Sequence, residues 1–244
     1  MNEQSQEPGT HRALRLRTRP GPAEAGVLLM HGGRADGLDA PSLLNLPGLR
    51  MRPFGAAVLD ATAGHAVALG EVRYRHRGWN GERADTVRDA RAAHAELTGT
   101  YGPLPLVAVG HSMGARAALR IGGDPGIRGV VALAPWCPPD EPVEHLAGRR
   151  VVLLHSDRDR ITDPDGSLLF AMRARQAGAE VCRLVIPGSD HAMLRRAADW
   201  HDLTGRLVAG LLGFADLPAD VAAALASGGG GNTGLALSAP TRTG

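Results

Sequence analysis

The chain has 244 residues, with 27 basic side chains against 25 acidic ones and a formal net charge of +2 at pH 7. This length suits one α/β domain with a sizeable core, and the near balance of charge does not predict binding to nucleic acid or to an anionic membrane. All 27 basic residues are arginine. The absence of lysine excludes Schiff-base, P-loop and Ser-Lys chemistry.

The two ends of the chain differ in composition from the rest. Residues 1–10 are polar, and residues 214–244 are rich in glycine and alanine, so we expect a disordered N-terminal tail, one domain over 11–213 and a weakly ordered or disordered C-terminal tail. The sequence contains no secretory signal and no apolar run of the roughly 18 residues that a membrane span needs. Cys137 and Cys182 lie far apart without ligand spacing, which predicts neither disulfides nor a zinc site. We expect a cytoplasmic protein.

Between these ends, strand-like and helix-like segments alternate. Residues 12–17 alternate leucine with arginine, as in an edge strand with one wet face, and residues 26–30 form a continuous apolar run, as in a strand covered on both faces. Further strands are expected at 66–74, 104–109, 129–134, 150–155 and 180–186, and helices at 52–62, 83–98, 115–121, 164–176 and 191–212. This alternation predicts right-handed crossovers and a mostly parallel sheet, with the functional site at the carboxyl ends of the strands.

A pentapeptide from Gly110 to Gly114, with Ser112 at its centre, joins the strand at 104–109 to the helix at 115–121. A serine at the apex of such a strand-turn-helix exposes its hydroxyl, and the flanking glycines avoid collisions with the neighbouring strand and helix. The arrangement is typical of the nucleophile elbow of a serine hydrolase. In the alternative interpretation, Ser112 only caps the following helix.

A serine hydroxyl becomes a useful nucleophile only when a base takes its proton and a carboxylate orients that base. The strand at 150–155 ends in a turn that contains Asp157, Asp159 and Asp163. We choose Asp159, because Asp157 is better placed to hold the turn and Asp163 precedes a helix; Asp157 is the leading substitute. His191 follows the last strand and is the candidate base, unless it is an ordinary helix-start residue.

Acyl transfer also needs donors for the oxyanion. The backbone N–H of Met113 lies at the start of a helix, and Gly33, in the turn after the strand at 26–30, is the second candidate. The glycine pair at 32–33 would equally suit a plain tight turn. Trp79 and Trp136 are expected to overhang the site and to bind substrate, and the arginines beside Trp79 could bind an acidic group or only carry solvated charge.

These motifs resemble the α/β-hydrolases of the lidless kind, which include small esterases and dienelactone-hydrolase-like enzymes. The resemblance covers residues 12–213, and the segment from 136 to 149 is too short for a helical lid. It implies a single-domain α/β-hydrolase fold without a cap domain. It implies that Ser112 is the nucleophile, Asp159 the acid and His191 the base. It also implies that the N–H groups of Gly33 and Met113 form the oxyanion hole.

Two positions depart from the family pattern. Ser156 stands where the family usually has glycine, and Pro164 follows Asp159 at five residues rather than four. The dienelactone hydrolases proper use a cysteine nucleophile, so Ser112 argues against that activity.

The function predicted from the sequence is serine-dependent hydrolysis of small carboxylic esters or thioesters through an acyl-enzyme. No metal and no organic cofactor are expected, and the partner is the small-molecule substrate; the oligomeric state is not predicted. One alternative is a non-catalytic hydrolase-fold protein that binds a small molecule or a partner. A peptidase or an acyltransferase would use the same triad.

Overall fold

The computed structural model describes residues 11–42, 45–227 and 233–239. The tail expected at 1–10 lies outside the described residues. Among the described residues, no helix combines the length and the apolar character that a membrane crossing requires.

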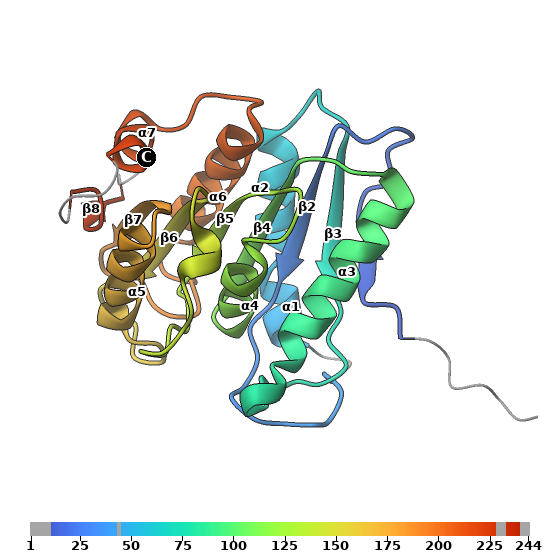
Figure 1. Cartoon of the computed structure of the whole chain (residues 1–244), viewed down its shortest axis with the longest axis horizontal. Helices are drawn as coiled ribbons and strands as arrows, with labels where there is room; N and C mark the ends of the chain where they lie inside the picture. Colours follow the sequence, from blue (N-terminus) through green and yellow to red (C-terminus); the bar gives the residue numbers. More distant parts are fainter. Residues whose placement is uncertain (1–10, 43–44, 228–232, 240–244) are drawn as a thin grey trace, which may run out of the picture.

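The strands of the described chain form one sheet in the order β1-β3-β2-β4-β5-β6-β7-β8 (Figure 1). All neighbouring strands run parallel except β1, which pairs antiparallel with β3. The strands are β1 (Leu14–Leu16), β2 (Ala25–Met30), β3 (Val67–Val72), β4 (Leu106–His111), β5 (Ile127–Leu133), β6 (Arg150–Ser156), β7 (Glu180–Ile186) and β8 (Leu237–Ser238). The mostly parallel sheet with an edge strand at its start is confirmed.

Helices cover both faces of this sheet (Figure 1). One face carries α3 (Asp85–Tyr101), α4 (Met113–Ile121) and α5 (Pro164–Gln176), and the other carries α2 (Arg52–Ala61), α6 (Ala197–Leu212) and α7 (Ala219–Ala226). The short helix α1 (Leu46–Arg50) leads into α2. Strand β2 sends Leu28 and Met30 to the α3 face, and Val27 and Leu29 to the α2 face. A strand covered on both faces needs an apolar residue at every position, which explains the unbroken run at 26–30.

The course of the chain creates a crevice at the carboxyl ends of β2 and β4. Strand β3 follows β2 along the chain and lies on one side of it, whereas β4 lies on the other side. In open α/β sheets, such a switch of direction leaves room for a ligand outside the strand ends. In Figure 1 the arrows of β2 and β3 point to the lower edge, where the turns that follow β2 and β4 meet.

The sequence pattern predicted that the last long helix begins at His191, but helix α6 begins at Ala197. The backbone adopts positive φ angles of 56° at Met193 and 59° at Arg196, which no continuous right-handed helix allows. The carboxylate of Asp190 accepts hydrogen bonds from the N–H groups of Leu194 and Arg195. His191 therefore lies in a structured loop between β7 and α6.

The C-terminal part is more ordered than its composition predicts. Helix α7 buries Val221 and Ala224 against the face that α6 covers, and β8 pairs in parallel with β7. Small apolar side chains are enough to hold α7 in place, because this face of the sheet already presents apolar side chains to pack against. Residues 228–232 and 240–244 lie outside the described residues, and the expectation of a weakly ordered or disordered tail over 214–244 stays a prediction.

No lid domain lies over the carboxyl ends of the strands in the described chain. Between β5 and β6, the chain forms only one short 3₁₀ turn, η2 (Glu144–Leu146). The lidless architecture expected from the short segment at 136–149 is confirmed.

Candidate active site

Ser112 stands on a strained turn between β4 and α4. Its φ of 55° and ψ of −116° are uncommon for a residue with a side chain, and its N–H donates to the Leu133 carbonyl at 3.0 Å. A Cβ atom at Gly110 would collide with the carbonyl of Gly114, and one at Gly114 would collide with the carbonyl of Met30. The glycines are therefore needed, as expected. The Ser112 hydroxyl makes no capping bond to α4, which argues against the helix-cap interpretation.

The structure brings together the three side chains selected from the sequence. Nε2 of His191 lies 3.1 Å from Oγ of Ser112, and Nδ1 of His191 lies 2.8 Å from Oδ2 of Asp159. Asp159 follows β6 and has a fully buried carboxylate, whereas 15% of the His191 side chain is exposed. The carboxylate can therefore hold a proton on Nδ1 and leave Nε2 free to accept the serine proton.

Both oxygens of the Asp159 carboxylate accept hydrogen bonds. Oδ1 accepts the N–H groups of Ile161 and Thr162 at 2.8 and 3.0 Å, and Oδ2 accepts the Thr162 hydroxyl at 2.8 Å. Burial raises the pKa of Asp159, but hydrogen bonds from His155, from His191 and from these N–H groups outweigh it and hold the pKa well below its usual range. These hydrogen bonds thus hold Asp159 in its anionic form.

A second histidine contacts the same carboxylate. His155, fully buried at the end of β6, lies with Nε2 3.1 Å from Oδ2 of Asp159 and with Nδ1 2.8 Å from Oγ of Ser167. Arg183 donates to Oγ of Ser167 at 3.0 Å and to the Pro164 carbonyl at 3.0 Å. The Ser167 hydroxyl donates to the same carbonyl at 2.8 Å. Because the Asp159 carboxylate can only accept, Nε2 of His155 holds the proton in its contact with Oδ2.

The sequence analysis assigned Asp159 to the site but not its neighbours His155, Thr162 and Ser167. The signal was present, because His155 ends a strand and stands four residues before Asp159 in the same turn. We call His155, Asp159, Thr162 and Ser167 the acid end of the site.

The other two aspartates of the turn have different partners. Asp157 accepts the Gly188 N–H at 2.7 Å and joins the turn after β6 to the turn after β7. Asp163 caps α5 and accepts the Asp165 N–H at 3.0 Å. Among the described residues, neither of these aspartates forms a hydrogen bond or an ion pair with His191, so Asp159 is better placed than Asp157.

His111, also missed as a site residue, lies directly beneath His191. Nε2 of His111 lies 2.9 Å from the carbonyl oxygen of His191 and donates to it, and the two rings lie 4.8 Å apart. Burial, followed by the nearby His191, lowers the pKa of His111 to about 3. A neutral, buried imidazole therefore holds the backbone of the loop that carries His191.

The turn that contains Gly33 packs against the Met113 side chain. A Cβ atom at Gly33 would overlap the Met113 side chain, and one at Gly32 would lie 3.4 Å from Cβ of Ser112. Met113 is the first residue of α4, where N–H groups have no partner within the helix. The turn after β2 thus packs against the elbow, and the donor roles of Gly33 and Met113 stay predictions.

The guanidinium of Arg116 packs against both Trp79 and Trp136, whose rings meet at 75°. Its central carbon lies 3.9 Å from the ring centroid of Trp79 and 4.4 Å from that of Trp136. Arg116 and Arg120 also form ion pairs with the buried Glu141. Only 3% of Trp79 is exposed, so it is part of the core beneath the site and offers little surface to a substrate.

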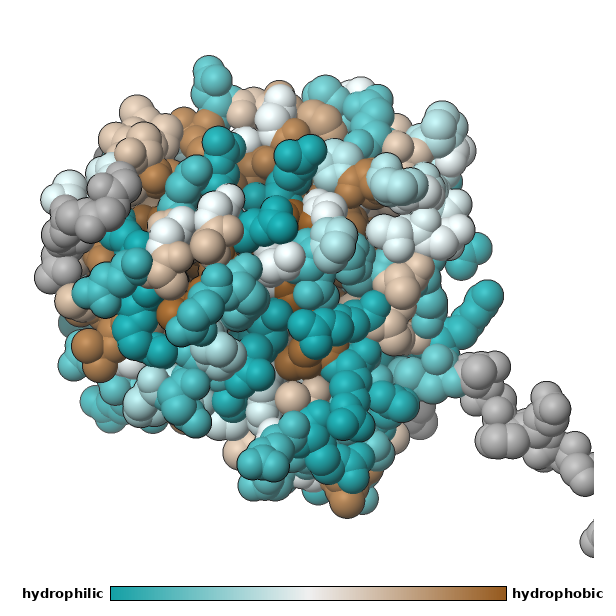
Figure 2. Space-filling model, in the orientation of Figure 1, coloured by the Kyte–Doolittle hydropathy of each residue, from teal (hydrophilic) through white to brown (hydrophobic). Residues whose placement is uncertain are grey.

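Trp136 is half-buried and lies closer to the nucleophile. The backbone N–H of Trp136 donates to the Ser112 carbonyl at 3.4 Å. Figure 2 shows the neighbouring loops, around residues 34–42 and 75–84, as a lower projection that is mostly hydrophilic. Of the two tryptophans, Trp136 is the more exposed, and the substrate-binding role of both stays a prediction.

No family model matches the sequence, and a search of curated proteins finds no match. Solved structures do match. A serine hydrolase homologue from Coxiella burnetii is 16% identical, with a TM-score of 0.58 over 80% of this chain and 90% of that one. An esterase from Thermogutta terrifontis with propionate bound is 17% identical, with a TM-score of 0.61 over 84% and 90%.

A lidless serine hydrolase from Xanthomonas campestris is also 17% identical, with a TM-score of 0.54 over 78% of this chain and 84% of that one. At these identities the likeness concerns the fold. The chain has the fold of the α/β-hydrolases, in the form without a lid, and the solved structures that it resembles are serine hydrolases and esterases.

Proposed function

We propose that the protein is a serine hydrolase that cleaves small carboxylic esters or thioesters through an acyl-enzyme on Ser112. The observation that carries the proposal is the pair of contacts made by His191, 3.1 Å to the Ser112 oxygen and 2.8 Å to the Asp159 carboxylate. A base must lie within hydrogen-bond reach of the proton that it takes, and its partner must hold the correct tautomer.

In the proposed reaction, Nε2 of His191 takes the proton of Ser112 while Oγ attacks the ester carbonyl carbon. The backbone N–H groups of Gly33 and Met113 stabilise the oxyanion that forms, and the positive end of α4 adds to this. The imidazolium then gives its proton to the leaving alcohol or thiol. Water, activated by the same imidazole, hydrolyses the acyl-enzyme and restores Ser112.

The contacts favour an enzyme over the alternative of a silent binding protein. A binder has no physical need for a strained serine, for a base in contact with it, or for a buried carboxylate with every lone pair used. Peptide hydrolysis and transfer of the acyl group to an acceptor other than water would use the same residues, and a panel of acyl chains, leaving groups and acceptors distinguishes them. We place the reaction in the cytoplasm, with support from the unpaired Cys137 and Cys182.

The test is labelling with a fluorophosphonate, followed by mass spectrometry of the modified peptide. An activated Ser112 reacts, whereas Ser112→Ala does not, and Ser227→Ala serves as a control far from the site. Hydrolysis of 4-nitrophenyl butyrate by Ser112→Ala should fall by about three to six orders of magnitude. A parent protein that neither reacts with the probe nor cleaves the ester would refute the proposal.

A further inference from the structure

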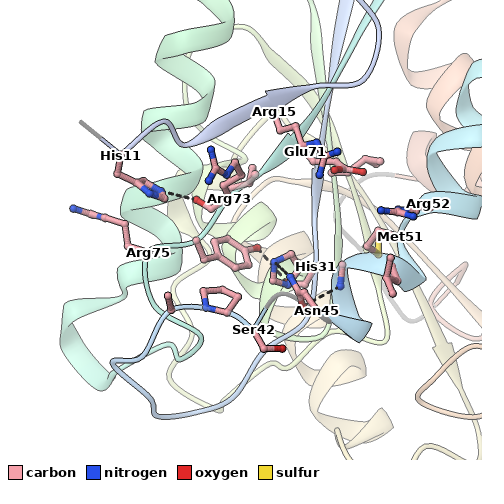
Figure 3. Close-up of a pocket in the computed structure, with 17 residues that line it drawn as sticks. His11, Arg15, His31, Ser42, Asn45, Met51, Arg52, Glu71, Arg73 and Arg75 are labelled. Carbon is pink, nitrogen blue, oxygen red and sulfur yellow. Dashed lines mark hydrogen bonds between the residues drawn. The ribbon is translucent and has the colours of Figure 1, made fainter. Parts of the chain in front are cut away.

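A pocket of about 420 Å³ lies at the carboxyl ends of β2 and β3, next to the triad but outside it (Figure 3). Its walls come from the start of β1, the turn after β2, the segment that leads through α1 into α2, and the chain after β3. The proposed mechanism uses none of its side chains. We call it the arginine pocket, after the lining residues Arg15, Arg52, Arg73 and Arg75.

The charge of the arginine pocket is not balanced by the protein. Of the charged residues that line it, Glu71 pairs with Arg17 at 3.4 Å, outside the lining, and Arg75 pairs with Asp89 at 2.7 Å. The remaining guanidinium groups, those of Arg15, Arg52 and Arg73, form no ion pair with any carboxylate in the described part of the chain.

These groups are mounted on rigid elements. Arg15 lies on β1, and the N–H of Arg73 donates to the Ala13 carbonyl at 2.7 Å, which continues the pairing of β3 with β1. Arg52 is the first residue of the ten-residue helix α2, whose N-terminal end adds a positive potential. Figure 3 shows the three arginines around the same side of the pocket, above His31 and Asn45.

The pocket lies across the turn after β2 from the nucleophile, and Ser112 is not among its lining residues. His31 forms part of its wall and accepts the hydroxyl of Tyr74 at its carbonyl, at 3.2 Å. The next residue, Gly32, lies against Cβ of Ser112. The rest of the wall is partly apolar, with Leu29 and Leu49 among its members. A ligand with an apolar body and an anionic end would therefore match the pocket along its length.

We propose that the arginine pocket holds an anionic group of the ester that Ser112 cleaves, either a carboxylate or a phosphate. Guanidinium groups bind both anions through paired hydrogen bonds and stay charged at every relevant pH. The preferred substrates are then esters with a negative charge several bonds from the scissile carbonyl. The catalytic part rests on the proposed function, whereas binding of the anion does not.

Calorimetric titration at low salt tests the binding without catalysis. Hexanoate and hexyl phosphate carry the two anions, and hexanamide is a neutral match for hexanoate. The anion that the pocket prefers should bind at least about tenfold more tightly than hexanamide, and Arg73→Gln or Arg52→Gln should remove most of that difference. Arg73→Lys keeps the charge and should retain part of it.

The matched control is Arg128→Gln, an exposed arginine at the amino end of β5, whereas the arginine pocket lies at the carboxyl ends of β2 and β3. It should bind the anions as the parent does. Tighter binding of hexyl phosphate would identify a phosphate ligand, and tighter binding of hexanoate a carboxylate. Equal binding of all three ligands, or equal loss in Arg73→Gln and Arg128→Gln, would overturn the proposal.

A kinetic comparison tests the substrate class. The mono-4-nitrophenyl ester of adipate differs from 4-nitrophenyl hexanoate only by its terminal carboxylate, and 6-acetoxyhexanoate compared with hexyl acetate places the charge on the alcohol side. The ratio of kcat/KM for charged over neutral ester should exceed about ten in one of these pairs, and it should fall toward one in Arg73→Gln.

The two proposals can fail separately. A parent enzyme that cleaves charged and neutral esters at equal kcat/KM overturns the anion preference and leaves the hydrolase standing. A protein that cleaves none of these esters but binds the anion through Arg52 and Arg73 overturns the hydrolase and leaves the arginine pocket as a binding site.

Discussion

The acid end of the site and the arginine pocket differ in how their charged groups are surrounded. Around Asp159, the side chains are buried and the carboxylate is saturated with hydrogen bonds. In the arginine pocket, Arg15, Arg52 and Arg73 are exposed and form no ion pair with any carboxylate of the described residues. A buried and satisfied network is rigid and insensitive to salt, whereas exposed unpaired charges await a ligand and are screened. The first arrangement suits chemistry that is common to all substrates, and the second suits selection among them.

The largest effect is expected at the acid end. Asp159→Asn should lower kcat by about four orders of magnitude for charged and neutral esters alike, because an amide no longer fixes the His191 tautomer. Steady-state kinetics on both kinds of ester measures it. Asp157→Asn is the matched control and should stay within about threefold of the parent. If Asp157→Asn lost activity and Asp159→Asn kept it, the acid would be Asp157.

The next largest effect concerns stability and pH. His111 has a folded-state pKa lowered to about 3, whereas an unfolded histidine titrates near 6.5. The unfolded chain therefore binds the extra proton between these values, so this contribution to stability is complete above about pH 6.5 and is lost as the pH falls toward 3.

Denaturant unfolding of the parent at pH 7.5 and pH 4.5 should accordingly show a drop in the free energy of unfolding, of which about 2 to 3 kcal/mol comes from His111. In His111→Gln, which keeps a donor toward the His191 carbonyl, the drop should be smaller by that amount. Other buried histidines, such as His31, contribute equally to both proteins. Identical drops would show that His111 does not carry this dependence.

A smaller loss is expected when the second donor to Asp159 is removed. His155→Phe should lower kcat by about ten- to hundredfold, because a carboxylate that loses a hydrogen bond inside the protein is held less firmly. His155→Gln can still donate from its amide and should recover part of the rate. The loss should be equal at 20 mM and 500 mM NaCl. If the loss of kcat in His155→Phe changed with NaCl concentration, the acid end would not be less sensitive to salt than the arginine pocket.

The smallest effect is the response of the parent enzyme to salt. Raising NaCl from 20 to 500 mM should reduce the preference for charged over neutral esters by a few-fold, since screening weakens exposed charges. The rate on neutral esters should change little. A preference that did not respond to salt would mean that the anion binds in a buried place, away from Arg15 and Arg52.

The fold could be predicted because its signals are local. The unbroken apolar run at 26–30 and the alternation of strands and helices identify a covered parallel sheet. The end of the chain could not be predicted, because β8 has only two residues and depends on backbone pairing with β7. The start of α6 was misplaced because positive φ angles at Met193 and Arg196 leave no mark in a hydrophobic pattern.

The candidate site was predictable where chemistry restricts the residue type. Ser112, Asp159 and His191 were selected on order and spacing, and the structure places them in contact. His155 was not assigned, although it ends a strand four residues before Asp159, because a histidine at that place can equally be a buried, hydrogen-bonded core residue. The burial of Trp79 could not be read from the sequence either, since it depends on Arg116, a charged residue of α4 that packs against the rings of Trp79 and Trp136.

The two-residue strand β8 has a consequence for handling the protein. It covers part of the outer edge of β7, whose backbone groups would otherwise be open to pairing with another molecule. A chain cut back before residue 233 would keep the catalytic contacts but leave this edge bare, and self-association through exposed strands would rise with concentration. Shortened versions made for crystallisation should therefore keep Leu237 and Ser238.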